Sequence, residues 1–175
     1  MKQRSNLIQT VSRLRNANVL VVGDIMLDQF VYGDVDRISP EAPIPILQIR
    51  HESNMLGGAG NVVRNIVGLG GNASLAAAIG NDAMGKKVSK LLEQNGLKCN
   101  SLVTVPNRAT GIKTRYLAGT QQLLRTDQES IGPIDAVTAR KVISAAKRAL
   151  KTCGAVIISD YGKGVLTFNL TQSFI

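Results

Sequence analysis

The chain has 175 residues, of which 44% are hydrophobic, and this is enough apolar material for one globular domain or part of one. No run approaches the roughly twenty consecutive apolar residues of a membrane span, and the amino terminus lacks the apolar stretch and cleavage site of a secretory signal, so we expect a cytoplasmic protein without a membrane partner. The net charge of +9 would suit binding to a polyanion. However, three Tyr, three Phe and no Trp offer few side chains on which bases could stack, and the basic residues are dispersed. We therefore do not expect nucleic acid as a partner.

An amphipathic helix is predicted at the start of the chain. Residues 6–16 carry Leu7, Ile8, Val11 and Leu14 at the spacing of one helical face. We expect this helix to pack on the outside of the domain.

Three short apolar runs, rich in β-branched or small residues, have the composition of strands that are buried on both faces of a parallel sheet. They are residues 19–22, 73–79 and 155–158, and each is followed by glycine or a carboxylate.

Segments with helical periodicity alternate with these runs. They are residues 59–67, 84–92 and 139–150, with Asp82 and Asp135 as expected N-caps. Alternating strands and helices predict an α/β fold, in which helices flank an open, mostly parallel sheet.

Two further segments interrupt this alternation. Residues 30–50 are rich in strand formers but contain Pro40, Pro43 and Pro45, and residues 111–127 alternate loosely around a glycine. Because proline confines a strand to an edge or to a small separate sheet, we expect both segments to form a β-flap, or lid, that closes over a ligand.

Ligands of open α/β sheets bind beyond the carboxyl ends of the strands. This rule predicts that residues 23–28, 80–82 and 159–163 converge in space. In the first of these clusters, Asp28 could accept hydrogen bonds from sugar hydroxyls, or it could cap a turn or a helix; Asp24 favours the turn role more strongly.

A glycine-rich turn at residues 56–60 runs directly into the helix expected at 59–67. Gly57 and Gly58 would let the backbone approach a ligand, the helix start favours an oxygen-rich group, and Asn61 adds a side chain that suits a polyol. The turn is neither a Walker loop nor a Rossmann fingerprint. A tight helix start without a ligand remains the alternative.

Two further sets of polar residues are candidates for phosphate binding. Asp160 and Lys163 follow the third apolar run, where Lys163 could hold a phosphate and Asp160 could orient it or a hydrated Mg²⁺; an ordinary surface ion pair is the alternative. Lys113, Arg115, Gln121, Gln122 and Arg125 have strand spacing on the flap and would contact phosphate or hydroxyl groups, or they are solvated.

The two cysteines, Cys99 and Cys153, and the single histidine, His51, lie far apart in the sequence. We therefore expect buried free thiols and no metal held by Cys or His, while carboxylate-bound or phosphate-bound Mg²⁺ stays open.

The Gly-Asp-Ile-Met-Leu-Asp string at 23–28 and the Gly-Gly-Ala-Gly-Asn string at 57–61 resemble the paired sugar-binding elements of the ribokinase-like, or PfkB, carbohydrate kinases, and the resemblance runs over nearly the whole chain. More specific strings at 33–43, 121–125 and 159–164 resemble the kinase domain of the enzymes that make ADP-heptose for bacterial lipopolysaccharide. The resemblance implies transfer of phosphate from ATP, with Mg²⁺, to the anomeric hydroxyl of D-glycero-D-manno-heptose 7-phosphate.

The resemblance also implies roles for individual residues. It implies sugar contacts, lid closure or a nearby phosphate for the substrate-binding set Asp28, Gly57, Gly58, Asn61, Gln122, Arg125, Asp160 and Lys163. A homodimer formed through the lid is a further implication.

One departure from the family pattern concerns catalysis. The family's Gly-Ala-Gly-Asp element, which carries the general base, does not occur in this sequence, so the general base is expected beyond Ile175. We therefore expect residues 1–175 to be the amino-terminal part of such a kinase domain, with its ATP-binding half absent, no catalytic residue of its own and one sheet edge uncovered. Another sugar or nucleoside kinase, or a sugar-phosphate-binding module without turnover, is the alternative.

Overall fold

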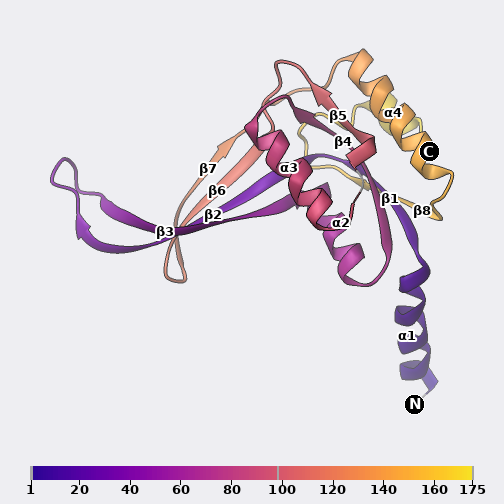
Figure 1. Ribbon diagram of the computed structural model, residues 1–175, viewed down its shortest axis with the longest axis horizontal. Coiled ribbons are helices and arrows are strands. Elements are labelled where there is room, and N and C mark those ends of the chain that lie inside the picture. The colour runs from indigo at the N-terminus through magenta and orange to yellow at the C-terminus, as the bar shows by residue number, and fades with distance from the viewer. Residues whose placement is uncertain (1, 98, 175) are drawn as a thin grey trace.

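The computed structural model describes residues 2–97 and 99–174, and its centre is a parallel sheet (Figure 1). The strands of this sheet are β1 (Asn18–Gly23), β4 (Asn72–Gly80), β5 (Leu102–Val105) and β8 (Ala155–Ser159), in the order β5-β4-β1-β8. Every neighbouring pair is parallel. The three predicted strands therefore form one sheet, and β5 joins them as a strand that the sequence pattern did not predict.

Helices cover both faces of the parallel sheet, as the alternation of strands and helices predicts. Their bounds are Ala59–Gly68 for α2, Ala83–Gln94 for α3, Ala136–Leu150 for α4 and Phe168–Gln172 for α5. In β1, Val21 belongs to the hydrophobic cluster beneath α2 and α3, whereas Leu20 and Val22 belong to the cluster beneath α4 and α5. This two-residue period is that of a strand buried on both faces.

Both expected N-caps are present. The Asp82 carboxylate accepts a hydrogen bond from the Gly85 amide over 2.7 Å, and the Asp135 carboxylate accepts one from the Thr138 amide over 2.7 Å. Each carboxylate satisfies a backbone donor that the first turn of its helix leaves unpaired.

A second, mixed sheet forms the predicted lid and extends well away from the rest of the molecule (Figure 1). Its strands are β2 (Ile25–Ile38), β3 (Pro45–Gly58), β6 (Gly111–Ala118) and β7 (Gln121–Gln128), in the order β3-β2-β6-β7. β2 pairs with β3 and β6 with β7 in antiparallel fashion, while β2 and β6 are parallel.

The first lid segment is longer at both ends than the predicted residues 30–50, and β3 runs to Gly58, so the glycines expected in a turn lie at the end of a strand that leads directly into α2. β2 starts at Ile25, and Asp28 is paired with Met55 of β3 and with Lys113 of β6. Asp28 is therefore a strand residue, and the alternative in which it caps a turn or helix is wrong. The ladder reaches this far because Leu27 packs in the core between its register partners Leu56 and Ile112.

The helix expected at residues 6–16 is present as α1 (Lys2–Arg13), followed by a 3₁₀ turn at Leu14–Asn16. Its predicted packing on the domain is wrong, because Ile8 and Val11 are 64% and 56% exposed and the helix projects from the body (Figure 1).

β8 is an edge strand, so its predicted burial on both faces is also wrong. Ile157 and Ile158 point to opposite faces and are each 38% exposed. The apolar composition of β8 suggested a central strand. In the described part of the chain, however, no strand pairs with its outer edge, and its two faces are partly exposed.

One sequence prediction falls at the carboxyl end of the chain. Ile175, beyond which the general base is expected, lies outside the described residues. The last element that the structure describes before it is α5, which ends at Gln172. The placement of the general base beyond Ile175 therefore stays a prediction.

Chemical expectations from the sequence have mixed outcomes. Cys99 and Cys153 are free thiols but only half-buried, and burial raises the pKa of Cys99.

No helix in the described ranges is both long and apolar enough to cross a membrane.

Candidate functional site

The turn after β1, the glycine turn before α2 and the loop after β8 meet at Asp24, which is 1% exposed. The Asp24 carboxylate accepts hydrogen bonds from the backbone amides of Tyr161, Lys163 and Val165, each over 3.0 Å. Its carbonyl oxygen accepts one from the Ala59 amide over 2.9 Å. The predicted convergence of residues 23–28 with residues 159–163 is therefore present, and the buried Asp24 joins the glycine turn to both.

The two glycines before α2 are required by close contacts. Gly58 has φ of +57°, and a Cβ at this position would lie 2.3 Å from the Asp24 carbonyl oxygen. A Cβ at Gly57 would lie 2.4 Å from Oδ2 of Asp28. The Asp28 carboxylate thus occupies the space that a side chain at Gly57 would fill, and only glycine permits this arrangement.

Asp28 and Asn61 lie on the same side of the lid. Asp28 and Met55 are directly opposite in the β2–β3 ladder, so their side chains share a face. Arg64 of α2 donates to the Met55 sulfur over 3.1 Å and to Oδ1 of Asn61 over 2.9 Å. These contacts connect the amide of Asn61 to the face on which Asp28 lies.

The same face of the lid carries three cations. Asp28, Phe30 and Tyr32 of β2 are in register with Lys113, Arg115 and Leu117 of β6. Lys113, Arg115 and Leu117 are in turn in register with Asp127, Arg125 and Gln122 of β7. Because residues that are directly paired point to one side, Arg125 lies on the Asp28 face. Gln122 lies there too, although regular alternation would put it on the opposite face, because a register shift in the β6–β7 ladder between Tyr116 and Leu117 resets the alternation of β7.

Ion pairs organise these charges. Arg115 donates to Oδ1 of Asp28 over 2.7 Å, and its guanidinium lies 5.1 Å from the centre of the Phe30 ring. Asp127 accepts from Lys113 and from Arg125, each over 2.9 Å. The hydrogen bond from Lys113 is the main reason why the pKa of Asp127 lies below its usual range.

The loop after β8 presents its two candidate residues differently. Nζ of Lys163 donates to Oε1 of Glu129 over 2.6 Å, and both side chains are largely buried. Asp160 is exposed, and its carboxylate accepts from the Gly162 amide in its own turn. The carboxylate that orients Lys163 is therefore Glu129, and the predicted pairing of Asp160 with Lys163 does not occur.

The cluster at residues 80–82 joins the site through the segment before β6. The Asp82 carboxylate accepts from the amide and the hydroxyl of Thr110, each over 2.8 Å. Two residues earlier, Arg108 donates to the backbone carbonyls of Lys163 and Gly132. The cluster at residues 80–82 is thus connected to the loop after β8 indirectly, through the segment from Arg108 to Thr110.

Sequence reasoning missed Arg108 and Glu129, which hold the Lys163 loop. Arg108 stands in a turn beside Pro106 and Asn107, and Glu129 stands just after the last lid strand. Neither position has a local pattern that distinguishes it from a solvated charge, because its partners are more than twenty residues away.

A small cavity of about 20 Å³ lies where these elements meet. It is lined in part by Asp24, Met26, Arg108, Glu129 and Lys163. This volume accommodates about one water molecule, so a sugar phosphate does not fit inside and would have to lie on the open face of the lid.

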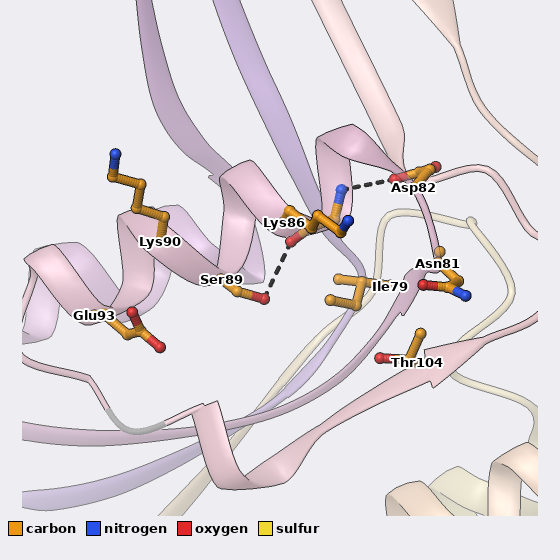
Figure 2. Close-up of a pocket in the computed structure, with 10 residues that line it drawn as sticks. Ile79, Asn81, Asp82, Lys86, Ser89, Lys90, Glu93 and Thr104 are labelled. Atoms are coloured by element: carbon orange, nitrogen blue, oxygen red, sulfur yellow. Dashed lines mark hydrogen bonds between the residues drawn. The ribbon is translucent and has the colours of Figure 1, made fainter.

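A larger hollow of about 510 Å³ lies elsewhere, between α3 and β5 (Figure 2). Figure 2 shows Ser89, Glu93 and Thr104 directed toward this space, whereas Lys90 extends away from it. The carboxylate of Asp82 at its rim is already bonded to Gly85 and Thr110. Lys86, Lys90 and Glu93 also line the hollow, but none of the predicted sugar-binding residues does.

The chain is similar in sequence to known carbohydrate kinases. The profile of the "pfkB family carbohydrate kinase" matches residues 16–161. A protein of Rhodospirillum rubrum named "Bifunctional protein HldE" is 51% identical over 97% of this chain and 34% of its own length. The protein of the same name from Aliarcobacter butzleri is 42% identical over 92% of this chain and 34% of its own length.

Solved structures give the same fold. A putative phosphofructokinase from Staphylococcus aureus superposes with a TM-score of 0.64 at 16% identity, covering 89% of this chain and 47% of its own. A carbohydrate kinase from Agrobacterium tumefaciens gives a TM-score of 0.59 at 20% identity, covering 81% of this chain and 45% of its own. Likeness at this level of identity shows the fold, which is ribokinase-like. The chain spans about a third of the length of the curated relatives named above.

Proposed function

The chain belongs to the pfkB family of carbohydrate kinases, and we propose that it supplies the sugar-phosphate-binding part of a kinase that phosphorylates D-glycero-D-manno-heptose 7-phosphate at the anomeric hydroxyl. The observation that carries the proposal is the placement of the Asp28 carboxylate against Gly57, on a lid face that also carries Lys113, Arg115 and Arg125. This face therefore offers a carboxylate that can accept hydrogen bonds from sugar hydroxyls and cations that can bind a phosphate.

In this proposal Asp28 accepts hydrogen bonds from sugar hydroxyls. Arg115 engages one carboxylate oxygen of Asp28 and so fixes the orientation of the group. The backbone at Gly57 and Gly58 lies close to the sugar ring, and Asn61 offers an amide to a further hydroxyl. Holding the sugar in one orientation is the larger part of what a kinase must do before phosphoryl transfer.

The phosphate of the substrate is assigned to the basic residues. Arg125 is half-exposed and, with Gln122, lies on the outer lid strand, where it can reach a phosphate group. Lys163 is assigned to a phosphate near the end of β8, and Asp160 to the exposed rim of the same loop. The net charge of +9 suits a reaction complex that contains two phosphorylated ligands, the sugar phosphate and ATP.

The choice of heptose 7-phosphate is supported by the strings at 33–43, 121–125 and 159–164 and by relatives that are 42% and 51% identical. The three cations on the Asp28 face of the lid support a phosphorylated sugar in preference to a neutral one. Other sugar kinases share the fold at 16–20% identity, so the fold itself does not choose the substrate.

ATP, Mg²⁺ and the general base expected beyond Ile175 are assigned to the part of the longer relatives that this chain does not match. Among the described residues no group of three or more His, Cys, Asp or Glu side chains could hold a metal ion. When bound, ATP would supply the phosphoryl group and Mg²⁺ would neutralise its developing charge. The residues of this chain bind and orient the acceptor, and we propose that the chain alone does not turn over.

The open edge of β8 is the proposed junction with that further part. Ile157 and Ile158 are exposed on its two faces. Pairing of another strand with β8 would satisfy the backbone groups of its open edge and extend the parallel sheet, and the added segment would reduce the exposure of both side chains.

A homodimer through the lid is a second element of the proposal. Ile38, Ile44 and Ile49, near the far end of the β2–β3 hairpin, are 61%, 57% and 56% exposed. An exposed apolar group of this kind on a projecting hairpin suits contact with a second copy of the chain.

A coupled ADP-release assay tests the substrate. A version extended to the full length of its relatives would be compared on heptose 7-phosphate, fructose 6-phosphate and ribose. The proposal predicts a clear preference for heptose 7-phosphate in kcat/KM, and a preference for either competitor would replace it with another sugar kinase.

Calorimetric titration of the 175-residue chain tests the division of labour. We expect binding of heptose 7-phosphate and no binding of a nonhydrolysable ATP analogue. Tight binding of the analogue would show that the chain holds nucleotide without the further part.

A further inference from the structure

Lys163 is held at each of its three polar groups. Its amide donates to Oδ2 of Asp24 over 3.0 Å, its carbonyl accepts from Arg108, and its Nζ donates to Glu129 over 2.6 Å. A long lysine side chain is normally among the most mobile on a protein surface. The position of this ammonium group is instead determined by the loop that carries it.

The loop after β8 folds around the carboxylate of Asp24. The amides of residues 161, 163 and 165 all donate to it, and the glycines between them, Gly162 and Gly164, have φ of +67° and +89°. Three alternate amides therefore converge on one carboxylate and form an anion-binding concavity, here called the nest. Asp24 is 1% exposed, so the anion in this nest belongs to the protein itself.

We propose that Asp24 is a positioning residue, whose carboxylate is the internal anion around which the loop of residues 160–165 folds, and that it thereby fixes the Lys163 ammonium for phosphate binding. The purpose assigned to Lys163 rests on the proposed function, whereas the role of Asp24 in the loop does not. Asp24 itself is too deeply buried to contact a ligand.

A carboxylate is the side chain that this position requires. Three amides need acceptor lone pairs, and the two oxygens of Asp24 supply them. In Asp24→Asn one oxygen is replaced by an NH₂ donor that faces backbone donors, so at least one buried amide would lose its partner.

The test is the Asp24→Gly variant in the presence and absence of formate, a carboxylate small enough to enter the vacated nest. The readout is the rate at which an amine-acylating reagent labels Lys163, measured by mass spectrometry relative to Lys113. Lys113 is a matched control because it is also paired, with Asp127, but lies on the lid. General loosening of the structure would raise both rates and leave their ratio unchanged.

We expect the Lys163 to Lys113 ratio to rise about tenfold in Asp24→Gly, in line with the loss of hydrogen bonds to a charged group, and to return toward the wild-type value as formate is added. The wild-type ratio should not respond to formate. An unchanged ratio in the variant, or a raised ratio that formate does not lower, would overturn the proposal.

Two further measurements cover the case in which Asp24→Gly does not fold. Formate-dependent recovery of its circular dichroism would support the internal-anion role, and no recovery at saturating formate would refute it. Titration of the wild type with heptose 7-phosphate separates the two proposals: absent binding would overturn the proposed function, while the formate response still decides the role of Asp24.

Discussion

The guanidinium of Arg115 and the carboxylate of Asp28 form an ion pair of 2.7 Å between two strands of the lid, and each side chain is only 22% exposed. A second Arg–Asp pair of the same length, Arg50 with Asp34, lies farther out on the β2–β3 hairpin and is 62% and 52% exposed. These two ion pairs are thus alike in chemistry and differ in their surroundings.

This contrast gives the first prediction. Arg115→Met should weaken binding of heptose 7-phosphate about tenfold or more, because hydrogen bonds to charged groups contribute about 1.5–3 kcal/mol and Asp28 would lose its fixed orientation. Arg50→Met should change affinity little, because exposed pairs contribute about 0–1 kcal/mol. Calorimetry on both variants checks this, and equal losses would show that the lid's general charge, and not the Asp28 site, determines binding.

A second prediction concerns the glycine turn. Gly58→Ala should lower the free energy of unfolding by at least about 2 kcal/mol, because the positive φ is strained for alanine and its Cβ would meet the Asp24 carbonyl oxygen at 2.3 Å. Gly68→Ala is the control, since a Cβ there meets nothing within 4 Å and helix α2 should be unchanged or gain up to about 1 kcal/mol. Urea denaturation measures both variants. Similar stability of the two would remove the steric argument for glycine at position 58.

The third prediction concerns pH. Burial raises the pKa of Asp82, but hydrogen bonds from Thr110 and Gly85 outweigh it and leave the pKa below its usual value. A depressed pKa means that the charged carboxylate adds stability above the unfolded pKa of about 4 and loses it as pH falls through the lower folded value. The wild type should therefore exceed Asp82→Asn in unfolding free energy most at pH 5–7, with the difference shrinking toward pH 3. A difference that does not vary with pH would contradict this account.

The fourth prediction tests the lid as an interface between two copies. Ile44→Glu should shift the chain toward monomer in sedimentation velocity, because a charge would be buried in the proposed contact. Ile131→Glu is the matched control, since Ile131 is 83% exposed and lies outside the lid. A wild type that is monomeric at all concentrations, or one whose dimer survives Ile44→Glu, would rule out this interface.

The sequence predicts the framework of the fold because local patterns determine it. Periodicity places α2, α3 and α4 within a few residues, and the caps Asp82 and Asp135 are recognisable from their position before an apolar helix. β5 is missed because four residues carry too little pattern, and β8 is misjudged because its neighbours in the sheet, and not its composition, decide burial.

The candidate site likewise has a part that local sequence patterns predict and a part that depends on distant contacts. Asp28, Gly57, Gly58 and Asn61 stand in recognisable strings, and the structure brings them to one side of the lid. The partners that orient the site, Arg115 for Asp28 and Glu129 for Lys163, depend on strand register and on contacts across 34 or more residues. No local pattern records such pairings.

The central claim is that sugar phosphate binds on the Asp28 face of the lid beside the glycine turn. Amide chemical-shift mapping of the isotopically labelled chain, titrated with heptose 7-phosphate, tests it most directly. We expect the largest shifts at residues 28, 57–61 and 163. Shifts centred instead on residues 81–93, which line the hollow between α3 and β5, or the absence of any shift at saturating ligand, would contradict the claim.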